Sequence, residues 1–138
     1  MSFQSITVRT VVNRPVKDVW KKWTVPEDIM EWNSASDDWY APSAVNDLRE
    51  GGEFHYQMAA RDGSFGFDFG GIYDEVIPEE RIAYTLGDGR KVRVTFAPAD
   101  GGVEVTEVFD AETENSLELQ RAGWQAILNH FKRHAEST

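Results

Sequence analysis

The chain has 138 residues, no cysteine and a formal net charge of −10, from 14 basic and 24 acidic side chains. This length fits one ordinary domain, residues 1–138, with enough apolar material for a core. The negative charge would repel a phosphate backbone or an anionic bilayer, so we expect neither nucleic-acid binding nor membrane insertion. The lack of cysteine excludes disulfides, thiol nucleophiles and cysteine-ligated zinc. Without a signal-peptide pattern, a cytoplasmic location is expected.

The first third of the chain predicts one strand and two short helices. Alternation from Ile6 to Val12 is typical of a half-buried strand. Pro15 suits a first helical turn, and helical spacing then joins the apolar residues Val16, Val19, Trp20 and Trp23. Thr24 and Glu27 have the spacing of a capping box for the second helix, which carries Ile29, Met30 and Trp32.

Residues 33–42 are rich in turn formers but contain Trp39 and Tyr40, which predicts an ordered loop that could act as a lid. From Ala44 to Phe109, extended segments alternate with glycine turns such as Asp62-Gly63 and Asp88-Gly89. Asp-Gly between alternating apolar runs predicts hairpins, and therefore an antiparallel meander of about six strands. Glycines within residues 65–77 predict a bulge or bend, which would curve the sheet.

The chain closes with a predicted helix of about twenty residues. Asn115 and Glu118 have capping-box spacing. One apolar stripe is expected to comprise Leu117, Trp124, Ile127, Leu128 and Phe131. The order of a strand, two helices, six strands and a long helix predicts an α+β fold.

This order resembles the helix-grip fold of the START-like superfamily, also called SRPBCC or birch-pollen-allergen-like, in which a curved antiparallel sheet grips a C-terminal helix. The segments 26–33, 46–52, 62–65 and 123–128 resemble bacterial proteins of the family named for the activator of the ninety-kilodalton heat-shock protein ATPase. The resemblance spans essentially the whole chain. It implies a pocket for an apolar or amphipathic small molecule between sheet and helix. A chaperone partner is a weaker implication, because the family's namesake has a further N-terminal domain.

Alternation predicts which side chains face the closing helix. Phe54, Tyr56 and Met58 share one face of a strand, and Phe65, Phe67 and Phe69 share a face of the next. These rings either fill a core or line a cavity, and their mixture of Phe, Tyr, Met and Trp favours a small-molecule site. The predicted ligand-binding residues are Trp32, Trp39, Tyr56, Met58, Phe67, Phe69, Tyr84, Phe96, Glu107, Arg121 and Trp124.

Glu107 breaks the apolar pattern of its strand, because it shares parity with Val103, Val105 and Phe109 and is therefore directed inward. Arg121 lies four residues after Leu117 and three before Trp124, so it is predicted on the apolar stripe, where it could pair with Glu107. A structural ion pair, a polar anchor for a ligand and an acid/base group all fit this arrangement. Glu107 is thus the one candidate catalytic residue.

The remaining polar candidates favour ordinary roles. His55 has outward parity, and His130 and His134 are more typical of helix-end cations than of metal ligands. Asp37, Asp38 and Asp68 could be metal ligands, but such carboxylates are more often capping or solvated. We therefore expect no metal and no cofactor.

Three functions are compatible with the sequence. The first is binding of a hydrophobic small molecule without a reaction, and the second is a cyclase-, hydrolase- or isomerase-like activity in the same cavity with Glu107 transferring a proton. The third is a co-chaperone or regulatory surface, which an exposed apolar patch would favour. A homodimer through an edge strand or a helix face is also compatible with the sequence.

Overall fold

The computed structural model describes residues 4–34 and 38–137. Its strands form one antiparallel sheet in the order β1-β7-β6-β5-β4-β3-β2. The predicted α+β helix-grip fold and the predicted order of elements are both confirmed. In chain order the elements are β1 (Ser5–Val12), α1 (Val16–Thr24), α2 (Pro26–Trp32), β2 (Trp39–Asn46), β3 (Glu53–Ala60), β4 (Gly66–Ile77), β5 (Arg81–Leu86), β6 (Lys91–Ala99), β7 (Gly102–Asp110) and α3 (Leu117–Ser137).

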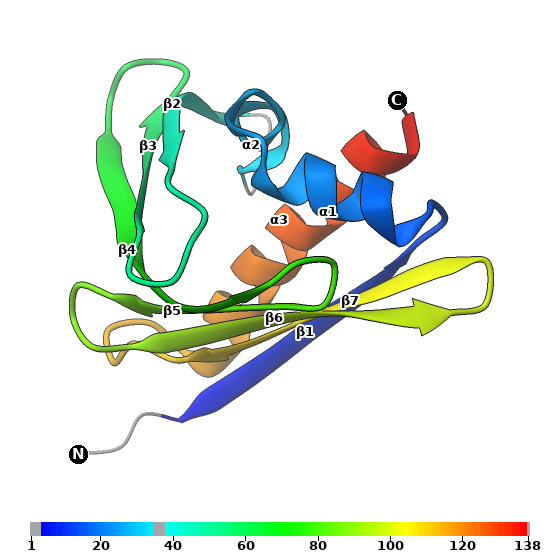
Figure 1. Ribbon diagram of the computed structural model, residues 1–138. Helices are drawn as coiled ribbons and strands as arrows, with labels where there is room; N and C mark the ends of the chain where they lie inside the picture. The colour runs from blue at the N-terminus through cyan, green and yellow to red at the C-terminus, as the bar shows by residue number, and fades with distance from the viewer. Residues whose placement is uncertain (1–3, 35–37, 138) are drawn as a thin grey trace.

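The sheet is strongly curled, and all three helices lie on its concave side (Figure 1). Strands β2 and β3 stand away from the layer that β5, β6, β7 and β1 form, while the long strand β4 passes between the two parts. The register of β4 against β5 shifts between Tyr73 and Glu75, as in a β-bulge. A β-carbon on Gly71 would lie 2.5 Å from the carbonyl oxygen of Thr85, so the bend brings the backbones too close for a side chain there. The predicted bend within residues 65–77 is therefore confirmed.

Helix α3 is held against β1 by packing and by hydrogen bonds near its end. The α3 residues Leu128 and Phe131 are fully buried. Lys132 donates to the carbonyl oxygen of Val11 at 2.6 Å and pairs with Glu136, whose carboxylate accepts from the backbone N–H of Asn13. Lys132 and Glu136 thus anchor the end of the helix to the end of β1.

The first turn of α3 differs from the predicted stripe. Leu117 is 40% exposed, and the buried side begins instead at Gln120. The Gln120 side chain accepts from the backbone N–H of Glu112 and donates to the carbonyl oxygens of Glu112 and Asn115. Polar anchoring of the preceding loop therefore replaces apolar packing in this turn.

Three local expectations were wrong. The expected loop from 33 to 42 ends early, because β2 begins at Trp39 and pairs with β3. Thr24 lies at the end of α1, where its hydroxyl donates back to the carbonyl oxygen of Trp20, so it does not cap α2. The cap of α3 is Ser116, whose hydroxyl oxygen accepts from the backbone N–H of Leu119. Within the described residues, none of the helices is both long enough and apolar enough to span a membrane.

Candidate functional site

A cavity of about 260 Å³ lies between the concave face of the sheet and the helices. Strands β3, β4, β5 and β7 contribute one wall, and α1, α2 and α3 contribute the other. Nine of its fifteen lining residues are aromatic. The lining comprises Trp23, Trp32, Asn33, Phe54, Tyr56, Met58, Phe67, Phe69, Tyr73, Ile82, Tyr84, Arg90, Glu107, Trp124 and Ile127.

The sheet wall is organised around Phe54 at the start of β3. Its ring centroid lies 4.7 Å from that of Tyr84, 5.1 Å from Tyr56 and 5.2 Å from Tyr73. These residues come from three adjacent strands, and side-chain alternation turns each ring to the concave face. Phe54 is 3% exposed, so the cluster is a packed floor beneath the cavity.

The helix wall is made largely of tryptophan. Trp23 of α1 and Trp32 of α2 pack together with centroids 4.7 Å apart, and the Trp32 indole N–H donates to the carbonyl oxygen of Lys22. Trp124 and Ile127 come from α3, one helical turn apart, and both are half-buried. Two short helices and the long helix thus each contribute rings to one wall.

Glu107 is the single acidic side chain among the lining residues, and only 4% of it is exposed. Burial raises the pKa of its carboxyl group from 4.5 to about 8. Over residues 4–34 and 38–137, no hydrogen bond or ion pair joins another side chain to this carboxyl group. The prediction that Glu107 faces inward is confirmed, and its carboxyl group enters the cavity uncompensated.

The pairing of Glu107 with Arg121 that the helical spacing allowed is not formed in the structure. Arg121 is exposed and does not line the cavity. It was placed by its spacing from both Leu117 and Trp124; Trp124 lines the cavity, but Leu117 lies outside the buried stripe. The helical spacing was correct, but Leu117 is not on the buried face of α3, so its position misplaced Arg121.

The cavity's cation is Arg90, in the turn between β5 and β6. Its Nε atom lies 2.7 Å from a carboxylate oxygen of Asp88, and 19% of its side chain is exposed. The adjacent Gly89 adopts a φ of 91°, which glycine tolerates and which closes this tight turn. Arg90 therefore reaches the cavity from its edge with its charge already neutralised.

Three tyrosines add hydroxyl groups to the sheet wall. Burial is the main cause that raises the pKa of Tyr56 and of Tyr84 well above 10, and it raises the pKa of Tyr73 to about 12. The charge of Glu107 also raises the pKa of Tyr84, which places that hydroxyl in the field of the carboxyl group. The Tyr73 hydroxyl donates to the side-chain oxygen of Asn46. All three remain neutral hydrogen-bonding groups at physiological pH.

Rings at the outer end of β4 mark where the cavity approaches solvent. Phe67 lines the cavity although it is 47% exposed. Trp39 packs beside it with centroids 5.8 Å apart, and Trp39 also contacts Phe65, which is 63% exposed. Trp39 therefore lies next to the mouth of the cavity without lining it.

The structure brings together eight of the eleven predicted ligand-binding residues in the lining of this one cavity. Besides Trp39 and Arg121, the exception is Phe96, which is 4% exposed and packs against Trp20 and Trp23 as part of the core. The prediction omitted seven lining residues. Phe54 was expected to face the helix but was not named as a ligand residue. The other six that were not named as ligand residues are Trp23, Asn33, Tyr73, Ile82, Arg90 and Ile127.

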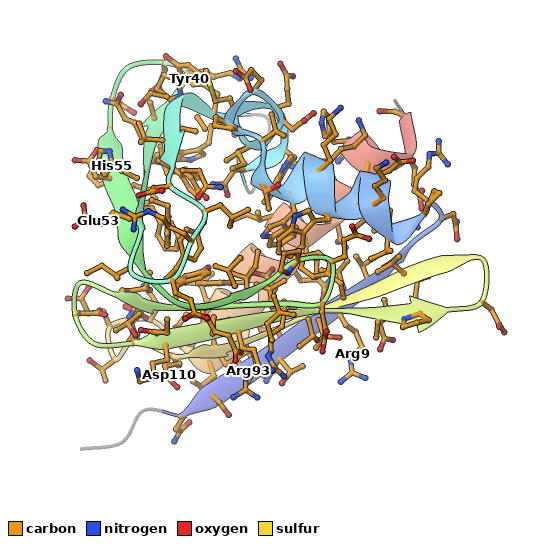
Figure 2. The ribbon with its side chains drawn as sticks, in the orientation of Figure 1. Arg9, Tyr40, Glu53, His55, Arg93 and Asp110 are labelled. Carbon is orange, nitrogen blue, oxygen red and sulfur yellow. The ribbon has the colours of Figure 1, made fainter. Side chains whose placement is uncertain are left out.

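The other polar candidates lie elsewhere. His55 is on the outer side of β3, turned away from the helices, as Figure 2 shows, and lies 3.5 Å from Asp68 of β4. His134 contacts Asp28 of α2 at 2.9 Å and so links two helices. Asp37 lies outside the described residues. In the part of the chain that the structure describes, no group of three or more histidine or acidic side chains is arranged to hold a metal ion.

Comparison with known proteins finds solved structures with the same fold as this chain and a family model that matches its sequence. The family model described as "Activator of Hsp90 ATPase homolog 1-like protein" matches residues 13–136. No curated protein matches the chain.

Three solved bacterial structures illustrate the similarity. The solution structure of an AHSA1-like protein from Aeromonas hydrophila is 42% identical with a TM-score of 0.91, over 97% of this chain and 93% of that chain. A solution structure from Cytophaga hutchinsonii is 50% identical with a TM-score of 0.84, over 96% and 92% of the two chains. A crystal structure from Chromobacterium violaceum is 24% identical with a TM-score of 0.85, over 96% of both chains, and shares the fold.

Proposed function

The chain belongs to the family of Activator of Hsp90 ATPase homolog 1-like proteins, and we propose that it binds a hydrophobic or amphipathic small molecule in the cavity between the curled sheet and α3. The observation that carries this proposal is the lining, in which nine aromatic rings surround about 260 Å³. Small-molecule sites are concave, predominantly apolar and equipped with a few polar groups that orient the ligand. Here Glu107, Arg90 and the tyrosine hydroxyls are those polar groups.

Energetics support the same proposal. An apolar cavity forfeits the contacts that a filled core would make, which costs about 24 cal/mol per Å³ of empty volume. A ligand that fills the space recovers those contacts. The half-exposed Phe67 at one end offers the ligand a route from solvent.

The test compares two tryptophan substitutions on α3. Ile127→Trp fills the cavity, whereas Leu119→Trp adds the same ring at a position that is 60% exposed and outside the lining. The neutral probe N-phenyl-1-naphthylamine should gain fluorescence with the unmodified protein and with Leu119→Trp. It should lose at least tenfold in affinity for Ile127→Trp. Equal binding by all three proteins would place the probe site elsewhere and overturn the proposal.

A second candidate function is catalysis in the same cavity, which one observation favours. Burial raises the pKa of Glu107 to about 8, and a carboxyl group with a pKa near neutrality can both accept and donate a proton. Native mass spectrometry of freshly purified protein, followed by organic extraction, would identify a bound compound. Incubating that compound with the protein and with Glu107→Gln then separates the two functions. Turnover by the unmodified protein alone, with binding retained in Glu107→Gln, indicates an enzyme, and the absence of turnover in both indicates a binding protein.

A further inference from the structure

We propose that the ligand of this cavity is a hydrophobic cation, an amine or quaternary ammonium compound whose positive charge lies against the carboxyl group of Glu107. This inference rests on the proposed binding function and names the chemical class of its ligand. It starts from an acidic side chain that the fold buries without giving it a partner.

The position of Glu107 in the sheet explains why no neighbouring side chain pairs with its carboxyl group. It lies on β7, where its neighbours across the sheet are Val8 of β1 and Val94 of β6, and both are buried. Neither neighbour offers a hydrogen-bond donor or a positive charge from its side chain. The carboxyl group lines the cavity with 4% of the residue exposed. The ionised form of this group is costly to bury unless it is paired, and the cavity is the side from which a partner can approach.

The rest of the lining also favours a positive charge. Cations are attracted to the faces of Trp, Tyr and Phe rings within about 6 Å of the ring centroid. Nine such rings surround the cavity, among them Trp124 from the helix wall and Tyr84 from the sheet wall, and the charge of Glu107 acts on the Tyr84 hydroxyl. The whole chain has a net charge of −10, which favours the approach of a cation over that of an anion.

Arg90 does not supply the missing partner. Its guanidinium group contacts the carboxylate of Asp88 at 2.7 Å. The backbone of Arg90 precedes Val94, the cross-strand neighbour of Glu107, by four residues, which is about 13 Å along an extended strand. Within the described residues the ion pair of Arg90 is with Asp88 and none joins it to Glu107, so the carboxyl group remains available to a ligand.

A neutral or an anionic ligand would form no attractive charge–charge interaction with Glu107. A neutral carbonyl compound needs hydrogen-bond donors, which the hydroxyl groups of Tyr56, Tyr73 and Tyr84 can provide without an acidic residue. An anionic ligand would be repelled by Glu107 whenever that group is ionised. A cation obtains from ionised Glu107 a charge–charge attraction that the other lining residues do not provide, since none of them is acidic.

Proton release gives the inference a measurable signature. The titratable and charged groups that line the cavity are Glu107, Tyr56, Tyr73, Tyr84 and Arg90. The helix wall contributes only Trp23, Trp32, Asn33, Trp124 and Ile127, none of which titrates. The raised pKa values keep the three tyrosines neutral between pH 6 and 8, and arginine side chains do not titrate in proteins, so Glu107 is the lining group that changes protonation in this window. A cation that requires ionised Glu107 should bind about tenfold more tightly for each pH unit from 6 towards 8.

The experiment uses two probes of the same shape. Phenethyltrimethylammonium carries a permanent charge, and (3,3-dimethylbutyl)benzene is its neutral carbon analogue, so only charge distinguishes them. Binding of each to the full chain is followed by tryptophan fluorescence at pH 6, 7 and 8. Glu107→Gln is measured alongside, and thermal denaturation shows whether this variant is folded.

We expect the cation to bind more tightly as the pH rises, and Glu107→Gln to bind it at least tenfold more weakly at pH 8 with no pH dependence. The neutral analogue should bind both proteins alike at every pH. If the cation binds no more tightly than the analogue and shows no rise with pH, the cation class is overturned while the binding function stands. If neither probe binds, the binding function itself fails. The pH series on the unmodified protein decides the matter even if Glu107→Gln does not fold.

Discussion

The indole of Trp124 stacks on the ring of Phe109, with ring centroids 3.9 Å apart and planes inclined by 10°. Phe109 is 1% exposed and lies two residues after Glu107 on β7, so the two side chains share the concave face. Trp124 in turn lines the cavity. This contact therefore fixes α3 over the strand that carries the buried carboxyl group.

Removing this contact should loosen the helix. We expect Trp124→Ala to lower the free energy of unfolding by about 3 kcal/mol, because it deletes a large ring from the interface between α3 and the sheet. Urea denaturation followed by far-ultraviolet circular dichroism measures the change. Leu119→Ala, on the exposed side of the same helix, should change it by less than about 0.5 kcal/mol. A similar loss in both variants would contradict the role given to the stack.

Glu107 should make stability depend on pH in a defined window. In the folded protein the pKa of this carboxyl group is about 8, above the 4.5 of an ordinary glutamate. Between these values the folded chain keeps a proton that the unfolded chain loses, so raising the pH destabilises the fold. The contribution of Glu107 is complete below about pH 4.5 and is lost by about pH 8.

The variant Glu107→Gln removes this titration. Relative to the unmodified protein, its free energy of unfolding should improve by about 1.4 kcal/mol for each pH unit between pH 5 and 8. Denaturation curves at pH 5, 6, 7 and 8 give the slope. Glu104→Gln, on the opposite face of β7, is the matched control and should show no such slope. Parallel stability curves for the unmodified protein and Glu107→Gln would show that Glu107 is not held protonated.

Asn46 should be a structural hub beside the cavity. It accepts a hydrogen bond from the hydroxyl of Tyr73 and donates to the carbonyl oxygen of Thr24 at 2.8 Å, so it connects β2, β4 and the end of α1. We expect Asn46→Ala to cost about 1–3 kcal/mol of unfolding free energy, because two part-buried groups lose their partner.

Tyr73→Phe should also destabilise the fold, because it removes one of the two bonds of Asn46 together with the side-chain hydrogen bond between Tyr73 and Tyr56. Equilibrium denaturation of both variants and of the double variant gives a double-mutant cycle. The double variant should lose less than the sum of the two single losses. Strict additivity would mean that Tyr73 and Asn46 do not interact in solution.

Two glycines should respond in opposite directions to alanine. At Gly71 a β-carbon would lie 2.5 Å from the carbonyl oxygen of Thr85, so Gly71→Ala should destabilise the fold by about 1–3 kcal/mol. Nothing lies within 4 Å of a β-carbon at Gly123, within α3, so Gly123→Ala should stabilise the fold by about 0.5–1 kcal/mol. A higher melting temperature for Gly71→Ala would contradict the close packing described around β4, and a lower one for Gly123→Ala would contradict the open space around Gly123.

Local sequence patterns determined the elements and much of the cavity lining. Period-two alternation predicted the inward faces of the strands, including the inward direction of Glu107, because side-chain alternation is a property of the strand itself. Glycine within residues 65–77 predicted the bend, since glycine accepts the close backbone contact at Gly71. These inferences depend on the local backbone and not on which helices and strands pack together.

Long-range packing decided what the local patterns left open. Helical spacing placed Arg121 and Trp124 on one stripe, but in the structure Arg121 is exposed and its neighbour Gln120 is buried. Phe96 has the same inward parity as Tyr84, yet Trp20 and Trp23 cover it, so it belongs to the core. Arg90 reaches the cavity from a turn, where no periodicity applies. A periodic pattern specifies the direction of a side chain from its own element, and only the tertiary structure determines which neighbour, if any, occupies the space there.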